Sequence, residues 1–209
     1  MKIAIIGAGN VGTTLGNAWI KRGHKVVFGV RDPESAKARS LAQKFPGARL
    51  FLNGEAAHNA EIIVLATPWQ STEMAVRACG DLDGKTIIDC TNPLKPDFSG
   101  LEIGFSISGA ELISEWASGA QVFKAMNQIG ARLMEAPHFP EKVKPVMFVC
   151  GEGALKSSVI LLVDQLGFTV IDAGELKIAR LLEPYGMLWI HLALMQKVPG
   201  DFAFALLKR

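Results

Sequence analysis

Short runs rich in isoleucine and valine alternate with helical segments through the first half of this 209-residue chain. The runs are apolar throughout and lack the polar–apolar alternation of a strand with one face in water, so we expect them to be buried on both faces. This pattern is typical of a parallel sheet covered by helices. The predicted strands are Lys2–Ile6, Lys25–Phe28, Ile62–Ala66 and Thr86–Asp89, with Arg49–Phe51 as a weaker candidate.

The alternation predicts an α/β fold of the Rossmann type, with a doubly wound and mainly parallel sheet. Asp32 precedes Pro33, and we expect it to cap the second helix with Pro33 at the first helical position. The helices predicted between the strands are Val11–Arg22, Glu34–Lys44, Gly54–Asn59 and Trp69–Cys79.

A smaller C-terminal α/β part is expected after the segment 92–96, whose two prolines exclude regular structure there. We place the division between residues 1–120 and 121–209. The segment 175–196 reads as helix interrupted near Pro184, and it is apolar on most faces, so it must pack against a core or a partner subunit. The other predicted elements of this part are the helices Ala110–Trp116 and Ala154–Gln165 and the strands Gln121–Phe123, Val146–Val149 and Thr169–Ile171.

Composition excludes several classes of protein. Hydrophobic residues make up 49% of the chain, which excludes disorder, and the net charge of +2 gives no basis for a nucleic-acid or anionic-membrane surface. The longest apolar stretch, 187–195, is too short to span a bilayer, and the N-terminal apolar run is too short for a signal peptide. The three cysteines form neither a disulfide framework nor a metal-ligand pattern. We therefore expect a reduced, cytoplasmic protein with no bound metal.

A glycine motif of the form G-x-G-x-x-G follows the first predicted strand and opens a helix. Gly7 permits the tight turn, Gly9 lets backbone N–H groups approach a pyrophosphate, and Gly12 allows close packing of helix on strand. The N-terminus of the helix supplies unpaired N–H donors and a partial positive charge. This placement predicts a dinucleotide site that includes Asn10 and Val11.

The end of the second strand distinguishes NADP from NAD. An NAD site places Asp or Glu there, about 20 residues on, to accept hydrogen bonds from the ribose 2′-hydroxyl. This chain instead has Gly29 and Val30 followed by Arg31, whose guanidinium suits a 2′-phosphate. The sequence therefore favours NADP, with Val30 and Arg31 beside the phosphate. A solvated surface arginine is the alternative interpretation of Arg31.

Two later strand ends are expected to line the same crevice, because ligands of such folds bind outside the carboxyl ends of the strands. Thr67 with Pro68, and Asn92, stand at these ends. Their hydrogen-bonding side chains suit a carboxamide or a ribose, although turn residues that bond their own backbone are equally expected. Asn127 and Lys124 end a later strand and could reach the nicotinamide or the acceptor, the alternatives being a helix cap and a solvated lysine.

The whole chain resembles the family of NADPH-dependent reductases of the deazaflavin coenzyme F-420 and their bacterial relatives. The dinucleotide domain of vertebrate transmembrane metalloreductases is more distantly similar. Relatives usually carry Ser or Thr in place of Val30, a hydroxyl that helps to hold the 2′-phosphate, and Phe in place of Met126. The stretches that carry the resemblance are Gly7–Gly12 with Arg31, Thr91–Leu94, Ser108–Glu111, Lys124–Asn127, and Leu182–Pro184 through Trp189–His191.

The resemblance implies hydride transfer between NADP(H) and a flavin- or deazaflavin-type acceptor in a homodimer. It assigns dinucleotide binding to residues 1–120, and the acceptor site and dimer contacts to residues 121–209. Hydride transfer between stacked rings needs little acid–base chemistry, so no catalytic residue is predicted. His191, in an apolar helix beside Trp189, is expected to be a core or interface histidine.

Two other functions remain open from the sequence. One is an NAD(P)-dependent dehydrogenase of a small substrate, for which Lys124 is the one attractive acid–base candidate. The other is a non-catalytic NADPH-sensing protein that signals through its dimer. Because a fold supports many functions, the fold alone does not separate these alternatives.

Overall fold

One eight-stranded sheet runs through the computed structural model, which describes residues 1–45, 47–139, 143–198 and 201–209. The spatial order is β3-β2-β1-β4-β5-β6-β7-β8, and every neighbouring pair is parallel except β6 with β7. This confirms the predicted Rossmann-type α/β fold. The strands are β1 (Lys2–Ile6), β2 (Lys25–Val30), β3 (Arg49–Leu52), β4 (Ile62–Leu65), β5 (Thr86–Asp89), β6 (Gln121–Lys124), β7 (Val146–Cys150) and β8 (Thr169–Gly174).

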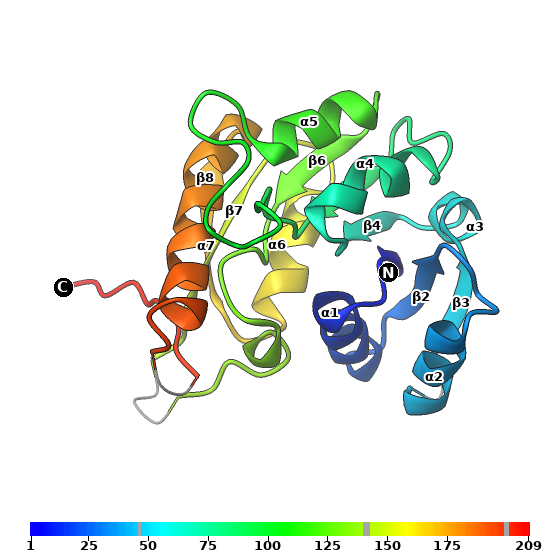
Figure 1. Cartoon of the computed structure of the whole chain (residues 1–209), viewed down its shortest axis with the longest axis horizontal. Coiled ribbons are helices and arrows are strands. Elements are labelled where there is room, and N and C mark those ends of the chain that lie inside the picture. Colours follow the sequence, from blue (N-terminus) through cyan, green and yellow to red (C-terminus); the bar gives the residue numbers. More distant parts are fainter. Residues whose placement is uncertain (46, 140–142, 199–200) are drawn as a thin grey trace.

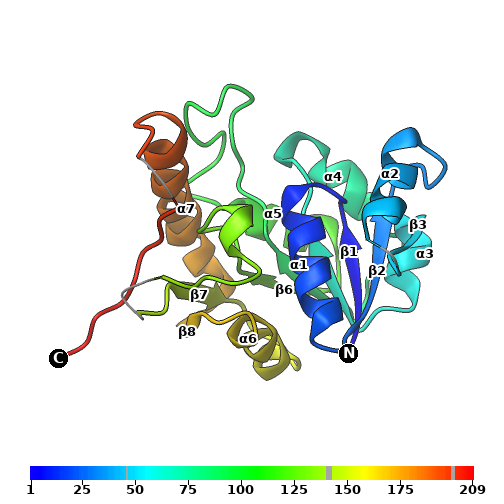
Figure 2. The same cartoon turned by 90° about the horizontal axis from the view of Figure 1, so that it is seen from below.

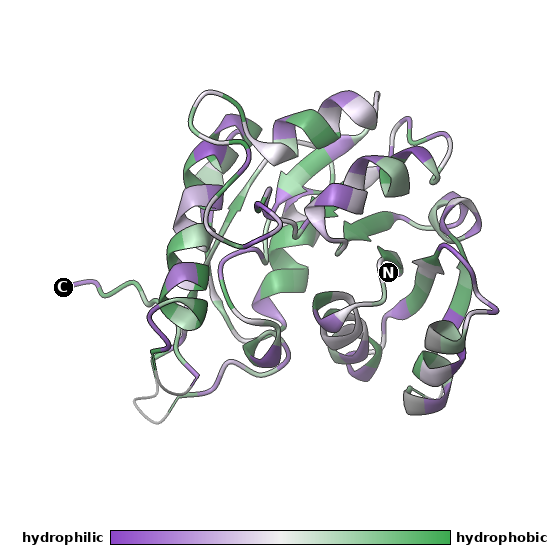
Figure 3. Ribbon diagram, viewed as in Figure 1, coloured by the Kyte–Doolittle hydropathy of each residue, from purple (hydrophilic) through white to green (hydrophobic). Residues whose placement is uncertain are grey.

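Helices cover both faces of the sheet (Figure 1). One face packs against α1, α2 and α6, the other against α3, α4 and α5. The strands are hydrophobic over most of their length (Figure 3), as burial on both faces requires. The helices are α1 (Asn10–Lys21), α2 (Ala36–Lys44), α3 (Asn53–His58), α4 (Trp69–Arg77), α5 (Gly109–Trp116), α6 (Lys156–Asp164) and α7 (Ala179–Leu194), with short 3₁₀ turns η1 (Ala131–Leu133) and η2 (Leu176–Ile178).

The chain order separates the loops that follow β1 and β4. From β1 the chain moves outward through β2 to β3, then returns to β4 on the other side of β1. The loops that follow β1 and β4 therefore separate at the carboxyl edge of the sheet, where ligands of open α/β sheets bind. Figure 2 shows β1 running from the N-terminus toward this edge.

The C-terminal part continues the sheet. β6 pairs with β5 in parallel, and β7 and β8 extend the sheet beyond it. The boundary predicted after residue 120 falls just before β6, so no break in the sheet accompanies it, and the division into two domains stays a prediction. Helix α7 packs on α5 and β7 through the small cluster of Ala110, Cys150, Ala179 and Leu182.

Two local predictions are wrong. The second helix begins at Ala36 rather than at Pro33, because the hydroxyl of Ser35 accepts a hydrogen bond from the backbone N–H of Ala38 and so caps it. The predicted interruption at Pro184 is also absent, since α7 runs through it. Proline removes one helical hydrogen bond. Leu182, Glu183 and Gly186, buried on either side of it, anchor the helix against its neighbours.

No described helix combines the length and the apolar character needed to cross a membrane.

Candidate active site

The glycine turn contains two glycines that the fold itself requires. Gly7 has a φ of +105°, a conformation that side chains rarely adopt, and a Cβ there would lie 2.6 Å from the carbonyl oxygen of Ala66. A Cβ on Gly12 would lie 2.0 Å from the carbonyl oxygen of Gly7. The turn and the helix after it could not close with larger residues at these two positions.

Gly9 is different, because nothing in the protein excludes a side chain there. Its φ of −85° is open to any residue, and no heavy atom lies within 4 Å of the place where a Cβ would stand. Gly9 occupies the N-cap position of α1, whose first turn has no side-chain cap. The empty space thus faces unpaired backbone N–H donors and the positive end of the helix dipole. These features fit a dinucleotide pyrophosphate, with Gly9 as the position of close approach.

A hollow of about 310 Å³ extends from this turn along the ends of β2 and β3. Gly7, Gly9, Val30 and Arg31 line it, and so does Asn53 at the start of α3. Arg31 is exposed, and no Asp or Glu of the described residues lines the hollow. Asp32 is the nearest carboxylate in sequence.

The carboxylate of Asp32 is used in a turn. Its Oδ1 accepts the backbone N–H of Glu34 at 2.8 Å, and its carbonyl accepts the Ser35 hydroxyl, also at 2.8 Å. Asp32 is therefore occupied, although not as the helix cap that the sequence predicts. Arg31 is left as the charged side chain of the hollow.

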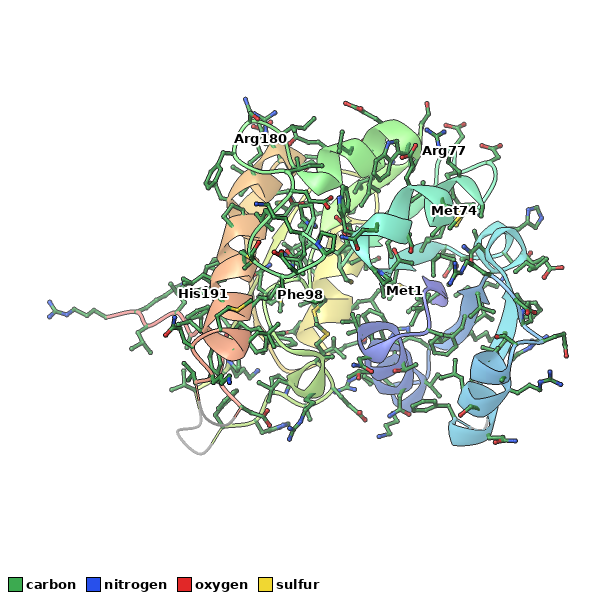
Figure 4. The ribbon with its side chains drawn as sticks, in the orientation of Figure 1. Met1, Met74, Arg77, Phe98, Arg180 and His191 are labelled. Atoms are coloured by element: carbon green, nitrogen blue, oxygen red, sulfur yellow. The ribbon has the colours of Figure 1, made fainter. Side chains whose placement is uncertain are left out.

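A second hollow of about 470 Å³ adjoins the first and shares Gly9, Thr67 and Pro68 with it. We call it the crevice. It brings together the ends of β1, β4, β5 and β6 with α7 and with Phe98 of the loop after β5 (Figure 4). Its walls include three large aromatic side chains, those of Trp69, Phe98 and Trp189. The predicted site residues that line it are Gly9, Asn10, Val11, Thr67, Pro68, Asn92 and Asn127.

Asn92 and Asn127 bind each other. The Nδ2 of Asn127 donates to Asn92 Oδ1 at 2.9 Å and to the carbonyl of Leu182 at 3.0 Å, while Asn92 Nδ2 donates to the carbonyl of Asn127 at 2.8 Å. Gln128 donates to the remaining oxygen of Asn127. Asn127 is thus neither a helix cap nor free to bind a ligand through its side chain. Asn92 keeps one N–H, which can face the crevice.

The glycine of α7 makes this pairing possible. A Cβ on Gly186 would lie 2.6 Å from the carbonyl oxygen of Asn127 and 3.0 Å from Asn92 Oδ1. Gly130 plays a similar part for Trp189, because a Cβ there would lie 2.5 Å from the indole ring. The two glycines set how closely α7 approaches the crevice.

The sequence offered two interpretations of Lys124, a solvated lysine or a side chain that reaches the nicotinamide or the acceptor. The structure shows neither, because Lys124 is buried and does not line the crevice. Its side chain is fully buried, and Nζ lies 2.7 Å from Asp89 Oδ2 and 2.8 Å from Glu183 Oε1. It also donates to the carbonyl of Thr91 at 2.6 Å. Burial acts to lower the pKa of Lys124, but the two carboxylates outweigh it and hold the pKa above its usual value. The ammonium therefore stays charged and keeps its proton at neutral pH.

Asp89 and Glu183 are site-supporting residues that the sequence interpretation missed. Glu183 accepts the backbone N–H groups of Gly109 and Ala110 at the start of α5, at 2.9 and 3.1 Å. Asp89 accepts the N–H of Thr91 at 2.8 Å. The available signal was a charged residue at the end of each of the apolar strands β5 and β6 and a glutamate within the mainly apolar helix α7, since a buried charge needs a partner.

The C-terminal residues also hold Trp189. Its indole N–H donates to the carbonyl of Phe202 at 3.0 Å, and the two rings stack with their centroids 5.1 Å apart. His191, labelled on α7 in Figure 4, is exposed, and neither it nor Met195 lines the crevice. His191 is therefore not a core histidine of the single chain.

Residues 2–93 match the model of the coenzyme F-420-dependent NADP oxidoreductases. The whole chain superposes on the crystal structure of a candidate F-420-dependent NADP reductase from Arthrobacter sp. FB24, with a TM-score of 0.90, 32% sequence identity and coverage of 100% of both chains. The chain belongs to the F-420-dependent NADP oxidoreductase family. This confirms the resemblance drawn from the sequence and identifies an NADP-dependent oxidoreductase.

Two further proteins are similar to part or most of the chain. A hypothetical protein from Sinorhizobium meliloti has a TM-score of 0.74 and 27% identity, over 86% of this chain and 88% of that one. An NAD(P)⁺ glycerol-3-phosphate dehydrogenase from Chlorobium phaeobacteroides is 32% identical over 108 residues, which are 46% of this chain. The matched region spans 32% of that dehydrogenase, about a third of its length.

Replacing Gly9 should separate binding from folding in this oxidoreductase. Gly9→Val places a side chain where the pyrophosphate would lie, so NADPH binding should be lost while the free energy of unfolding falls by no more than about 1 kcal/mol, as for a poorer helix cap. Gly12→Val is the matched control, and its overlap with backbone should cost about 3 kcal/mol. Denaturant unfolding and NADPH titration of both variants measure the two effects. Unchanged NADPH affinity in folded Gly9→Val protein would show that the dinucleotide lies elsewhere.

Proposed function

We propose that NADPH binds across both hollows, with its pyrophosphate at Gly9, its 2′-phosphate at Arg31 and its nicotinamide in the crevice. The space at Gly9 and the uncapped N-terminus of α1 support the first placement. The exposed guanidinium of Arg31 in a hollow without a carboxylate among the described residues supports the second. Bound there, NADPH would supply a hydride, and the chain would hold its nicotinamide among Thr67, Asn92 and the aromatic walls.

Arg31 is the residue proposed to select NADPH. Arg31→Ala should weaken NADPH binding by about 1.5 kcal/mol, or roughly tenfold, because a charge-assisted hydrogen bond to phosphate is lost. NADH binding should stay nearly the same. Arg39→Ala is the matched control, since Arg39 is an exposed arginine of α2 that does not line the hollow. Fluorescence titration with both nucleotides measures the effect, and equal losses for NADPH and NADH would show that Arg31 does not recognise the phosphate.

We further propose a flavin- or deazaflavin-type ring as the acceptor, on the observation that the crevice has almost no acid–base chemistry. Among the described residues, no Asp, Glu or His lines it, and its one cationic side chain is the exposed Lys95. Burial, followed by the charge of Asp89, raises the pKa of the Cys90 thiol, which stays protonated. Transfer of a hydride to a conjugated ring needs only alignment and exclusion of water, which these apolar and aromatic walls supply.

A dehydrogenase of a small substrate is the second candidate, favoured by the partial similarity to glycerol-3-phosphate dehydrogenase. Reduction of a carbonyl or an imine needs a proton donor near the reacting carbon. Lys124, the donor that the sequence suggests, is buried between two carboxylates and does not line the crevice. The contacts therefore favour the ring acceptor.

An acceptor panel tests this proposal. Oxidation of NADPH should be catalysed with flavin or deazaflavin present and should stay at the background rate with aldehydes, ketones or cyclic imines, because none of the described residues that line the crevice is an Asp, Glu or His and its one cationic side chain, Lys95, is exposed. The absorbance of NADPH is followed for each acceptor, with Gly9→Val as the control for reaction outside the site. Turnover with carbonyl or imine substrates alone would contradict the ring-acceptor proposal, and binding without turnover of any acceptor would favour the sensing role.

The homodimer and the cytoplasmic location also remain proposals. The outward face of α7 supports the first, since Leu181, Leu188 and Met195 recur every seven residues and are 63%, 48% and 44% exposed. Side chains spaced by seven lie on one face of a helix. A two-fold arrangement that packs α7 of one copy against the other would bury this stripe.

Leu188→Glu should prevent that dimer, because it would bury a charge in the proposed interface. Sedimentation at micromolar concentration should give a dimer for the unmodified chain and a monomer for the variant. Leu161→Glu is the matched control, since Leu161 is a leucine of α6 that is 49% exposed. Its substitution should leave the dimer intact. A monomeric unmodified chain would contradict the proposal.

A further inference from the structure

A separate hollow lies at the other end of the sheet from the proposed NADPH site. Its volume is about 670 Å³, which is within the range of small-molecule pockets. It opens between one side of α3 and the amino-terminal halves of β1, β2 and β3, whereas the dinucleotide hollows lie at the carboxyl ends. The lining residues are Lys2, Ile3, Lys25, Val27, Arg49, Phe51, Gly54, Glu55, Ala56 and His58 to Ala60.

The hollow exists because α3 is short. The helix has six residues, and it packs on β1, β2 and β3 through Asn53, Ala56 and Ala57 near their carboxyl ends. Nearer the amino ends of these strands, the same sheet face opens into the hollow. Val27 and Phe51 are half-buried there and form an apolar floor with Ala56. Most apolar surface of this sheet is covered, whereas this floor is open apart from the guanidinium of Arg49, which lies over the Phe51 ring at 5.4 Å from its centre.

Three cations surround the floor. Lys2 and Lys25 are register partners on neighbouring strands and both line the hollow, and Arg49 lines it from β3. Like charges side by side on a sheet face are destabilising. None of these three side chains takes part in an ion pair among the described residues.

The neighbouring groups leave the hollow cationic. Lys85 adds a fourth cation nearby, where its Nζ donates to the carbonyls of His58 and Ala60 at 2.8 and 3.1 Å. Two carboxylates are close in the fold, and each accepts a backbone N–H. Glu55 accepts that of Leu52 at 3.0 Å, and Glu61 accepts that of Lys2 at 2.8 Å. Four cations against two carboxylates favour an anion.

We propose that this hollow binds an organic anion with an apolar body, such as an aromatic carboxylate or sulfonate. The apolar part would cover Val27 and Phe51, and the acidic group would lie among Lys2, Lys25 and Arg49, whose mutual repulsion it would relieve. This hollow is separate from the proposed dinucleotide site. It shares no lining residue with either dinucleotide hollow, and it opens at the opposite edge of the sheet from both.

The test uses two fluorescent probes that differ in charge. Anilinonaphthalene sulfonate carries an acidic group, whereas phenylnaphthylamine is its neutral counterpart. With NADPH at saturation to fill the crevice, the sulfonate should bind about tenfold more tightly than the neutral probe, a difference of about 1.4 kcal/mol. Equal affinities would overturn the proposal that charge selects the ligand. Complete loss of sulfonate binding on addition of NADPH would place the probe in the crevice and also overturn it.

Paired variants locate the probe. Lys25→Gln with Arg49→Gln should reduce sulfonate affinity about tenfold. Lys144→Gln with Lys177→Gln should leave it unchanged, since these two exposed lysines do not line the hollow and their removal changes the net charge equally. Val27→Phe should weaken both probes by filling the floor. Equal effects of the two charge pairs would mean that the probe senses only overall charge, and the proposal would fail.

Discussion

A fully buried ammonium between two carboxylates holds the crevice together. Lys124 ends β6, Asp89 ends β5 and Glu183 lies on α7, so one group of charges joins two strands and a helix that are distant in the sequence. Glu183 reaches the N-terminus of α5 as well, where two backbone N–H groups and the helix dipole offset the excess negative charge. Taking three charges out of water is costly, and replacement by apolar residues is often no less stable. The contribution of this charge cluster is therefore to fix the relative positions of β5, β6 and α7 rather than to add stability.

These contacts fix the wall of the crevice that lies opposite the glycine turn, formed by the segments after β5 and β6 and by α7; we call it the far wall. The bond from Lys124 to the carbonyl of Thr91 fixes the chain where it leaves β5, directly before Asn92. Asn92 and Asn127 then bind each other, and Asn127 binds α7 through the carbonyl of Leu182. The near wall is the glycine turn, whose shape follows from Gly7 and Gly12. The proposed NADPH would thus lie between a wall set by backbone sterics and a wall set by buried charge.

The near wall could be predicted from the sequence and the far wall could not, for a physical reason. The glycine turn, the first helix and Arg31 belong to a strand–turn–helix–strand unit whose rules are local, so the positions of Gly7, Gly9 and Arg31 follow from spacing. The partner of Lys124 is set by tertiary packing, because Asp89 lies 35 residues away and Glu183 lies in the last helix. The errors at Asp32 and Pro184 have different origins, one local and one tertiary. At each, a local preference was outweighed by another contact, the cap of Ser35 in one case and the packing of Glu183 and Gly186 in the other.

Titration of the unmodified chain with NADPH and with NADH tests the central claim most directly, namely that the glycine turn and Arg31 form one site for the phosphorylated dinucleotide. Both ligands share the pyrophosphate and the nicotinamide, so their difference reports the 2′-phosphate alone. The account predicts a dissociation constant for NADPH at least about tenfold below that for NADH, as one charge-assisted contact would give. Equal dissociation constants, or tighter binding of NADH, would contradict it.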